Sequence, residues 1–310
     1  FNPTAADLTL IETGMGGRGD STNVIEAPAL SVITPIGLDH QDVLGATLAE
    51  IARHKAGILK RGAPAVIARQ PDETAMRVLE ARADEVGAPL FRVGVEWDAY
   101  VSHGRLVVQT EQRALDLPLP ALHGAHQIDN AGLACAVFLG PTRPTISDNA
   151  FATGVANASW PARLQPLTRG PFSAPIRAVG GEVWVDGGHN ADAADALARA
   201  LNDMAARRGG ESTVIVGLRK RKDAAAFVGA IARGTRRIIA VPLCEEHIAP
   251  HAIAALAHQL DTPAQTADSL VEAMQNAAQA TAPRVLICGS FALAAEALAL
   301  EGLVQATSSD

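Results

Sequence analysis

The chain alternates short apolar runs with longer segments whose apolar residues recur every three or four positions. In the first half, apolar runs bounded by turn residues predict buried strands at 8–12, 30–37 and 63–68. Helical spacing predicts helices over 43–60, 72–86 and 127–139. Apolar and polar residues alternate within 90–118, which predicts antiparallel strands.

The second half repeats one strand and one helix in turn. Strands are predicted at 183–186, 213–217, 237–243 and 284–289, separated by alanine-rich helices at 192–207, 223–233, 250–259 and 268–281. This alternation favours a parallel sheet that is covered on both faces. Residues 140–175 are rich in Pro, Thr and Ser, which marks a boundary. We therefore expect an α/β protein with domains at 1–158 and 159–310.

Length, charge and cysteine content narrow the class of protein. A chain of 310 residues suggests about two domains, and 26 Lys+Arg against 33 Asp+Glu gives a net charge of −7, which argues against a general nucleic-acid binder. No apolar run is long enough to span a membrane. The three cysteines, Cys135, Cys244 and Cys288, show no metal-binding spacing, and a reducing, cytoplasmic compartment is expected.

A glycine-rich segment follows the first predicted strand. Gly14 to Gly19 reads GMGGRG and satisfies the dinucleotide-binding pattern G-x-G-x-x-G. That pattern requires a helix directly afterwards, but residues 20–30 are too few for one and include Pro28. Two interpretations remain: a loop that brings its backbone close to a ligand, or a tight turn without one.

Polar side chains gather where the first two predicted strands end. They are Glu12, Asp20, Thr22, Asn23, Asp39 and His40. In an open parallel sheet, ligands bind beyond the carboxyl ends of the strands. Glu12 and His40 could therefore share a Mg²⁺ or Mn²⁺ site, or they could simply hydrogen-bond the loop backbone.

Lys55 falls in the apolar stripe of the helix predicted over 43–60. Leu48, Ile51, Ile58 and Leu59 lie seven and four residues before it and three and four after it. An unpaired ammonium is costly in such a stripe. The Lys55 side chain must extend to water, be paired, or be chemically modified.

The second half carries two further candidate features. Asp186 ends a strand, and the turn Gly187 to Asn190 leads into a helix, as in anion-binding helix starts; Asn190 could equally be a plain N-cap. The basic run at 219–222 could face phosphate or be a solvated loop.

Together these segments resemble the Mur ligase superfamily, and within it the bacterial dihydrofolate synthase/folylpolyglutamate synthase family. The segments that carry the resemblance are Glu12–Asn23 (ETGMGGRGDSTN), Ile36–Gly45 (IGLDHQDVLG), Arg53–Ile58 (RHKAGI), 130–134 (NAGLA), Pro161–Arg163 (PAR), Asp186–Asn190 (DGGHN), Lys222–Asp223 and Gly289–Phe291 (GSF). Their order and long-range spacing match across nearly the whole chain. The resemblance implies the rear part of a P-loop-type ATPase domain followed by a Rossmann-like C-terminal domain.

The resemblance also implies an activity and a set of site residues. Members of this family use ATP to phosphorylate a substrate carboxylate, here of dihydropteroate or a reduced folate, and the amine of L-glutamate then attacks the acyl phosphate. The implied roles are magnesium binding by Glu12 and His40, a carbamylated Lys55 in catalysis, pterin binding by Gly19, Asp20 and Ser21, ATP binding by Asn130, Arg163 and Asp186, and glutamate binding by His189 and Ser290, with His189 also catalytic. ATP, Mg²⁺ or Mn²⁺, and K⁺ are the implied cofactors, and a monomer without membrane or nucleic-acid partners is expected.

The sequence departs from the family pattern in informative places. The family's P-loop, G-x-x-G-K-[ST], is missing, so we expect the rear part of a longer enzyme that would not bind ATP properly alone. Ala162, Ala191, Arg221 and Ala292 replace residues common in the family. Two alternatives stay open: another Mur-type amino-acid ligase, or a folate-binding module without catalysis.

Overall fold

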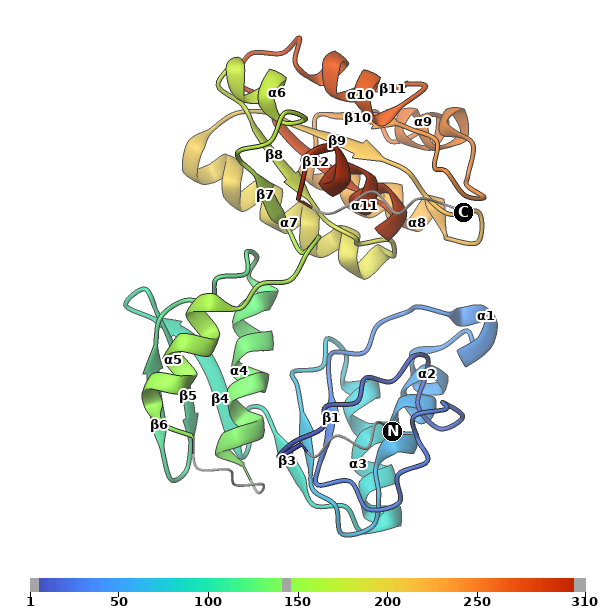
Figure 1. Ribbon diagram of the computed structural model, residues 1–310. Helices are drawn as coiled ribbons and strands as arrows, with labels where there is room; N and C mark the ends of the chain where they lie inside the picture. The colour runs from blue at the N-terminus through green and yellow to red at the C-terminus, as the bar shows by residue number, and fades with distance from the viewer. Residues whose placement is uncertain (1–5, 141–145, 304–310) are drawn as a thin grey trace. The chain divides into compact units, whose positions relative to one another are not determined.

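The computed structural model describes residues 6–140 and 146–303. The chain divides into two compact units: Phe1–Leu119 with Ile128–Ala156, and Pro120–Gln127 with Asn157–Asp310 (Figure 1). The chain therefore crosses between the units more than once, and the segment Pro120–Gln127 belongs to the second unit. None of the described helices is long and apolar enough to cross a membrane.

The first unit contains two small sheets. The first is parallel, in the order β1 (Ser31–Ile33), β2 (Ala65–Ile67) and β3 (Leu90–Arg92). Its core includes residues of α2 (Leu48–Lys55) and α3 (Glu73–Val86), among them Ile51 and Leu79. The second sheet is antiparallel and consists of β4 (Trp97–Ser102), β5 (Arg105–Thr110) and β6 (Ala114–Leu117), with a core shared by α4 (His126–Leu139) and α5 (Asp148–Asn157).

The strand predicted at 8–12 is wrong. These residues form no strand, and the side chains of Leu8 and Leu10 are 60% and 90% exposed. An apolar run becomes a strand only when another strand supplies hydrogen bonds to it, and no described strand pairs with this segment. The strand at 90–92 also differs from prediction, because β3 runs parallel to β2.

The single helix predicted over 43–60 is divided into three pieces. They are α1 (Gln41–Leu44), α2 and the 3-10 helix η1 (Ala56–Ile58). Gly45 adopts φ 109°, which ends α1. Thr47 then begins α2 with a capping box, in which its side chain accepts from the Glu50 backbone while the Glu50 side chain accepts from the Thr47 backbone. Local capping thus overrides the continuous apolar pattern.

The second unit is built on a six-stranded sheet in the order β11-β10-β9-β12-β8-β7. Its strands are β7 (Gln165–Leu167), β8 (Glu182–Val185), β9 (Ser212–Val216), β10 (Arg237–Ala240), β11 (Ala264–Thr266) and β12 (Arg284–Cys288). All neighbours pair in parallel except β7, which runs antiparallel to β8 at the edge. The predicted parallel sheet is confirmed.

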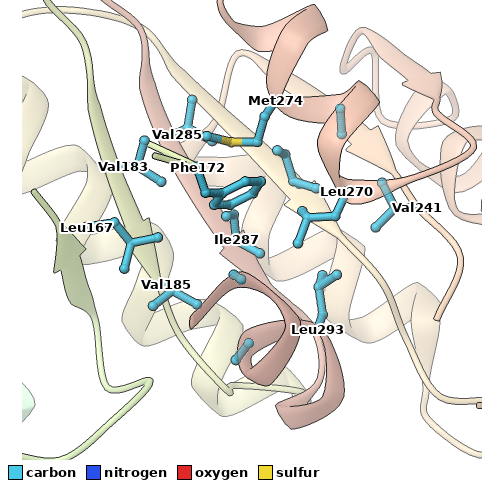
Figure 2. Close-up of a cluster of buried hydrophobic side chains, with 14 of the residues drawn as sticks. Leu167, Phe172, Val183, Val185, Val241, Leu270, Met274, Val285, Ile287 and Leu293 are labelled. Atoms are coloured by element: carbon cyan, nitrogen blue, oxygen red, sulfur yellow. The ribbon is translucent and has the colours of Figure 1, made fainter. Parts of the chain in front are cut away.

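Helices cover both faces of this sheet, as predicted. On one face, α6 (Ala174–Ala178), α10 (Leu270–Ala277) and α11 (Phe291–Leu300) share a core with the strands, and Figure 2 shows Phe172, Met274 and Ile287 packed in it. On the other face, α7 (Ala191–Arg208), α8 (Ala224–Ile231) and α9 (Pro250–His258) form the second core. The two cores hold the loops at the strand ends in fixed positions.

Candidate active site

A strained turn opens the candidate site of the second unit. Ala162 and Leu164 adopt φ 55° and 43°, which is a costly conformation for residues that carry a side chain. Both are buried, at 5% and 1% exposed, so packing holds them in place. Arg163 lies between them and is half-buried. The turn therefore presents Arg163 from a backbone that is fixed on both sides.

Asp186 fastens this turn to the end of β8. Its Oδ2 accepts from the Leu164 N–H at 2.7 Å, and its Oδ1 accepts from the Gly188 N–H at 2.6 Å. The Gly187 N–H in turn donates to the Ala162 carbonyl at 2.9 Å. Burial raises the pKa of Asp186, against the opposing effect of these hydrogen bonds and of the charges of Arg163 and His126. The family resemblance implies that Asp186 binds ATP. In the structure both of its carboxylate oxygens accept hydrogen bonds from backbone N–H groups.

The loop after β8 leads directly into α7. The Asn190 side chain accepts from the Ala193 N–H at 2.9 Å, so Asn190 is the N-cap of α7, one of the two roles its position suggested. His189 is half-buried, and its Nδ1 lies 3.0 Å from the Gly187 carbonyl oxygen. That contact orients the imidazole ring at the start of the helix.

Ser290 has a comparable role at the start of α11. Its side chain is 1% exposed, and its Oγ accepts from the Leu293 N–H at 3.0 Å. The Gly289 N–H donates to the Gly188 carbonyl at 2.8 Å, which joins this loop to the one after β8. Ser290 caps its helix, and the residue that reaches the surface here is its neighbour Phe291, which is 50% exposed.

The Phe291 ring brings two of the implied site residues together. The Arg163 guanidinium carbon lies 5.3 Å from the ring centroid. The His189 ring meets the same ring edge-on, with 5.6 Å between centroids. Of the implied residues, Arg163, Asp186, His189 and Ser290 thus lie on connected loops at one end of the sheet. The sequence indicated Phe291 only as the last residue of the Gly289–Phe291 motif, because its contacts with Arg163 and His189 join segments that are distant in the sequence.

The basic run at 219–222 is partly neutralised by its own unit. The Arg219 guanidinium pairs with Glu245, and Arg219 forms an isolated bridge with His247. Asp223 then caps α8 by accepting from the Ala226 N–H at 2.9 Å. These contacts favour a solvated, structured loop over a phosphate-binding one.

In the first unit, the glycine-rich loop folds around Asp20. The Asp20 carboxylate accepts from the Met15 N–H at 2.8 Å, from the Thr22 N–H at 2.9 Å and from the Thr22 hydroxyl at 2.6 Å. The hydroxyl bond and the two backbone bonds lower the pKa of Asp20 to about 2. Asp20 therefore organises the loop, while Ser21 beside it is exposed. No dinucleotide helix follows the glycines, as the sequence indicated.

The same loop packs closely on the end of α2. The Arg18 N–H donates to the His54 carbonyl at 2.8 Å. A Cβ on Gly17 would lie 2.8 Å from that carbonyl oxygen, and a Cβ on Gly57 would lie 2.4 Å from the Cβ of Arg18. The glycines are needed for this close backbone approach. Gly19 differs, since a Cβ there would meet nothing within 4 Å.

Lys55 is the last residue of α2 and is half-buried, so the fully apolar setting suggested by its spacing is only partly present. Its ammonium makes no hydrogen bond or ion pair with any described residue. Glu12 and His40 are exposed, and among the described residues no group of three or more His, Cys, Asp or Glu side chains could hold a metal ion. These two residues offer part of a donor set and not a complete metal site. Asn130 is an exposed residue of α4.

The sequence is similar to a known protein family and to curated relatives. Residues 175–291 match the family described as "Mur ligase, glutamate ligase domain". The chain is 30% identical to a probable dihydrofolate synthetase of Schizosaccharomyces pombe over 94% of this chain and 70% of that protein. It is 37% identical to the dihydrofolate synthase/folylpolyglutamate synthase of Bacillus subtilis over 63% of this chain and 44% of that protein.

The fold is also similar to that of solved structures of this family. E. coli FolC in complex with DHPP and ADP superposes with a TM-score of 0.80 at 28% identity, covering 92% of this chain and 64% of that one. Mycobacterium tuberculosis folylpolyglutamate synthase, complexed with ADP and AMPPCP, gives 0.74 at 30% identity, covering 94% and 67%.

These matches define a protein of the Mur ligase class, with its glutamate ligase domain in the second unit. More narrowly, the chain belongs to the dihydrofolate synthase/folylpolyglutamate synthase family. The chain spans about half the length of the first curated relatives it matches, 44% and 55%.

Proposed function

We propose that this chain is part of an ATP-dependent ligase of the cytoplasm that joins L-glutamate to dihydropteroate, to reduced folates, or to both. The reaction would pass through an acyl phosphate: a substrate carboxylate oxygen takes the γ-phosphoryl group and ADP leaves. The glutamate amine then attacks the acyl carbon and forms the amide C–N bond. The acyl C–O bond to the phosphorylated oxygen breaks, inorganic phosphate leaves with that oxygen, and the amine gives up a proton. Membership of the family supports the proposal.

The observation that carries it is the cluster of Arg163, His189 and Phe291 on the loops that Asp186 joins. A fixed guanidinium is suited to the charge that develops on a transferring phosphoryl group. We assign Arg163 to the phosphates and His189 to the incoming glutamate, with Asp186 and Ser290 supporting their loops. Asn130 is assigned to ATP on the family resemblance alone.

In the first unit, we assign Gly19, Asp20 and Ser21 to the pterin. Lys55 has no partner among the residues that the structure describes, which fits a lysine that becomes carbamylated, because the modification replaces a half-buried cation by an anion. Glu12 and His40 would supply two ligands to Mg²⁺ or Mn²⁺, which would neutralise phosphate charge when bound. We propose K⁺ as a further cofactor and a monomer as the working form.

The test is ADP release by the protein translated from its complete reading frame. We expect ADP release that requires both glutamate and a folate substrate. Comparing the release with dihydropteroate and with tetrahydrofolate decides whether the enzyme has one ligase activity or both. Lys55→Ala should abolish ADP release. Arg163→Ala should weaken the binding of ATP more than the binding of the folate substrate. Lys220→Ala and Arg169→Ala, at exposed positions, are the matched controls. Release with a different acceptor would indicate another Mur-type ligase, and no release at all would indicate a non-catalytic module.

A further inference from the structure

Phe291 is placed unlike the apolar residues of its helix that form the core. It begins α11 with 50% of its surface exposed, whereas Leu293, Ala294, Ala297 and Leu298 of the same helix are buried in the core. The hydrophobic core therefore does not explain the position of its ring. The contacts of the ring with other loops explain its position.

Three residues from other loops contact the ring. The guanidinium of Arg163 lies over it, and the ring of His189 meets it at an interplanar angle of 64°. On a third side the ring touches the backbone of Gly187, where an added Cβ would lie 2.3 Å from the Phe291 Cε1. Gly187 leaves room for the ring, and the ring contacts both the Arg163 guanidinium and the His189 imidazole.

The backbones that carry these side chains are tied to one another. Asp186 and Gly187 hold the turn of Arg163, and Gly188 accepts the hydrogen bond of Gly289, next to the cap of α11. With the backbones fixed, the rotamers of the long Arg163 side chain are the main freedom left in the cluster. A ring face attracts a guanidinium over it and leaves the N–H edge free to donate.

We propose that Phe291 is a positioning residue, which holds the Arg163 guanidinium and the His189 ring in the orientation that receives anionic groups of the substrates. This inference rests on the proposed function for the identity of those groups, phosphate at Arg163 and carboxylate at His189. The arrangement of the three side chains is independent of that function.

The test combines a structural and a binding measurement on the full chain. The ring current of Phe291 should shift the Arg163 Hε resonance; the shift should be lost in Phe291→Leu and kept in Phe291→Tyr. Inorganic triphosphate, titrated against the same resonance, should bind roughly two- to five-fold more weakly to Phe291→Leu, the range of an exposed cation–π contact. Progressive fluorination of the Phe291 ring should weaken binding in steps. Leu300→Ala, at an exposed position near the other end of α11, is the matched control and should change neither reading.

The inference would be overturned by an Arg163 resonance that is the same in Phe291→Leu, or by triphosphate binding that does not follow ring fluorination. Equal effects of Leu300→Ala would also overturn it, since they would show general loosening of α11. Failure of the proposed function is separate. A complete protein without glutamate-dependent ADP release would reject the ligase, while the ring-current shift would still decide whether Phe291 positions Arg163.

Discussion

The backbone N–H of Leu164 donates a hydrogen bond of 2.7 Å to the Asp186 carboxylate, across 22 residues of sequence. This bond joins an edge segment to the end of β8 and holds a residue at φ 43°. Strained backbone persists only where its surroundings fix it. The carboxylate of Asp186 is thus a determinant of where Arg163 lies.

Asp186→Asn should loosen this turn. The carboxamide keeps one acceptor oxygen and presents an NH₂ group to the second backbone donor, so one of the two hydrogen bonds is lost. We expect amide hydrogen exchange at Leu164 to speed up roughly ten-fold, which corresponds to about 1.4 kcal/mol. Asp192→Asn, at an exposed position in the first turn of α7, is the control. Unchanged exchange at Leu164 would show that packing alone holds the turn.

The glycine-rich loop should depend on pH through Asp20. The pKa of its carboxyl is about 2 in the folded chain, below the ordinary value of 3.8. A lowered native pKa means that the contribution of Asp20 is fully present above the ordinary value and is lost as pH falls through the native one. Amide exchange at Met15 and Thr22, corrected for intrinsic rates, should therefore accelerate as the pH falls from about 4 towards 2.

Asp20→Asn should remove this dependence and leave the loop open at every pH in that range. Asp42→Asn, at an exposed position of α1, should behave as the unmodified chain. A loop that opens with the same profile in Asp20→Asn would assign the transition to another group.

The end of α11 is fastened by a buried carboxylate. Glu301 is 4% exposed and accepts from the Gly170 N–H, the Ser173 N–H and the Ser173 hydroxyl at 2.7–2.8 Å. Glu301→Ala leaves these donors without an acceptor, so the free energy of unfolding should fall by about 1–3 kcal/mol. Glu296→Ala, an exposed position on the same helix, should change it by less than about 0.5 kcal/mol. Chemical denaturation of both variants measures the difference, and equal values would contradict the role of Glu301.

The parallel sheet of the second unit could be predicted because its strands are buried on both faces. Strand β9 is a continuous run of apolar and small residues, and β12 is apolar throughout after its first residue, Arg284. Neither strand has an exposed position, and such runs stand out from the alanine-rich helices between them. The edge strands β7 and β11 were missed, since each has only three residues and little apolar pattern. Helix α11 was missed as well.

The site was harder to predict than the sheet. Motifs identified Arg163, Asp186 and His189 as residues of interest, but their mutual arrangement depends on positive φ values at Ala162 and Leu164, where no glycine signals a turn. The strand predicted at 8–12 was wrong for a different reason. The segment is apolar, but a strand also needs a neighbouring strand to pair with, and no described strand pairs with this segment. Local sequence carries neither kind of information.

Gly57 should be the least replaceable glycine of the first unit's loop contact. An added Cβ would lie 2.4 Å from the Arg18 Cβ and 2.8 Å from the Arg18 nitrogen, so the glycine-rich loop would have to move away from α2. Overpacking of this kind costs about 1–3 kcal/mol. Gly57→Ala should therefore lower the free energy of unfolding by that amount and speed amide exchange at Arg18, whose N–H bonds to His54.

Gly154→Ala is the matched control, because a Cβ there meets nothing within 4 Å and the residue lies within α5. In a helix, alanine is favoured over glycine by about 0.5–1 kcal/mol, so this variant should be slightly more stable than the unmodified chain. The two substitutions add the same methyl group and are expected to have opposite signs. If Gly57→Ala were also neutral or stabilising, the glycine-rich loop would not be held against α2 in solution, and the close approach of Arg18 to this helix would have no part in shaping the site.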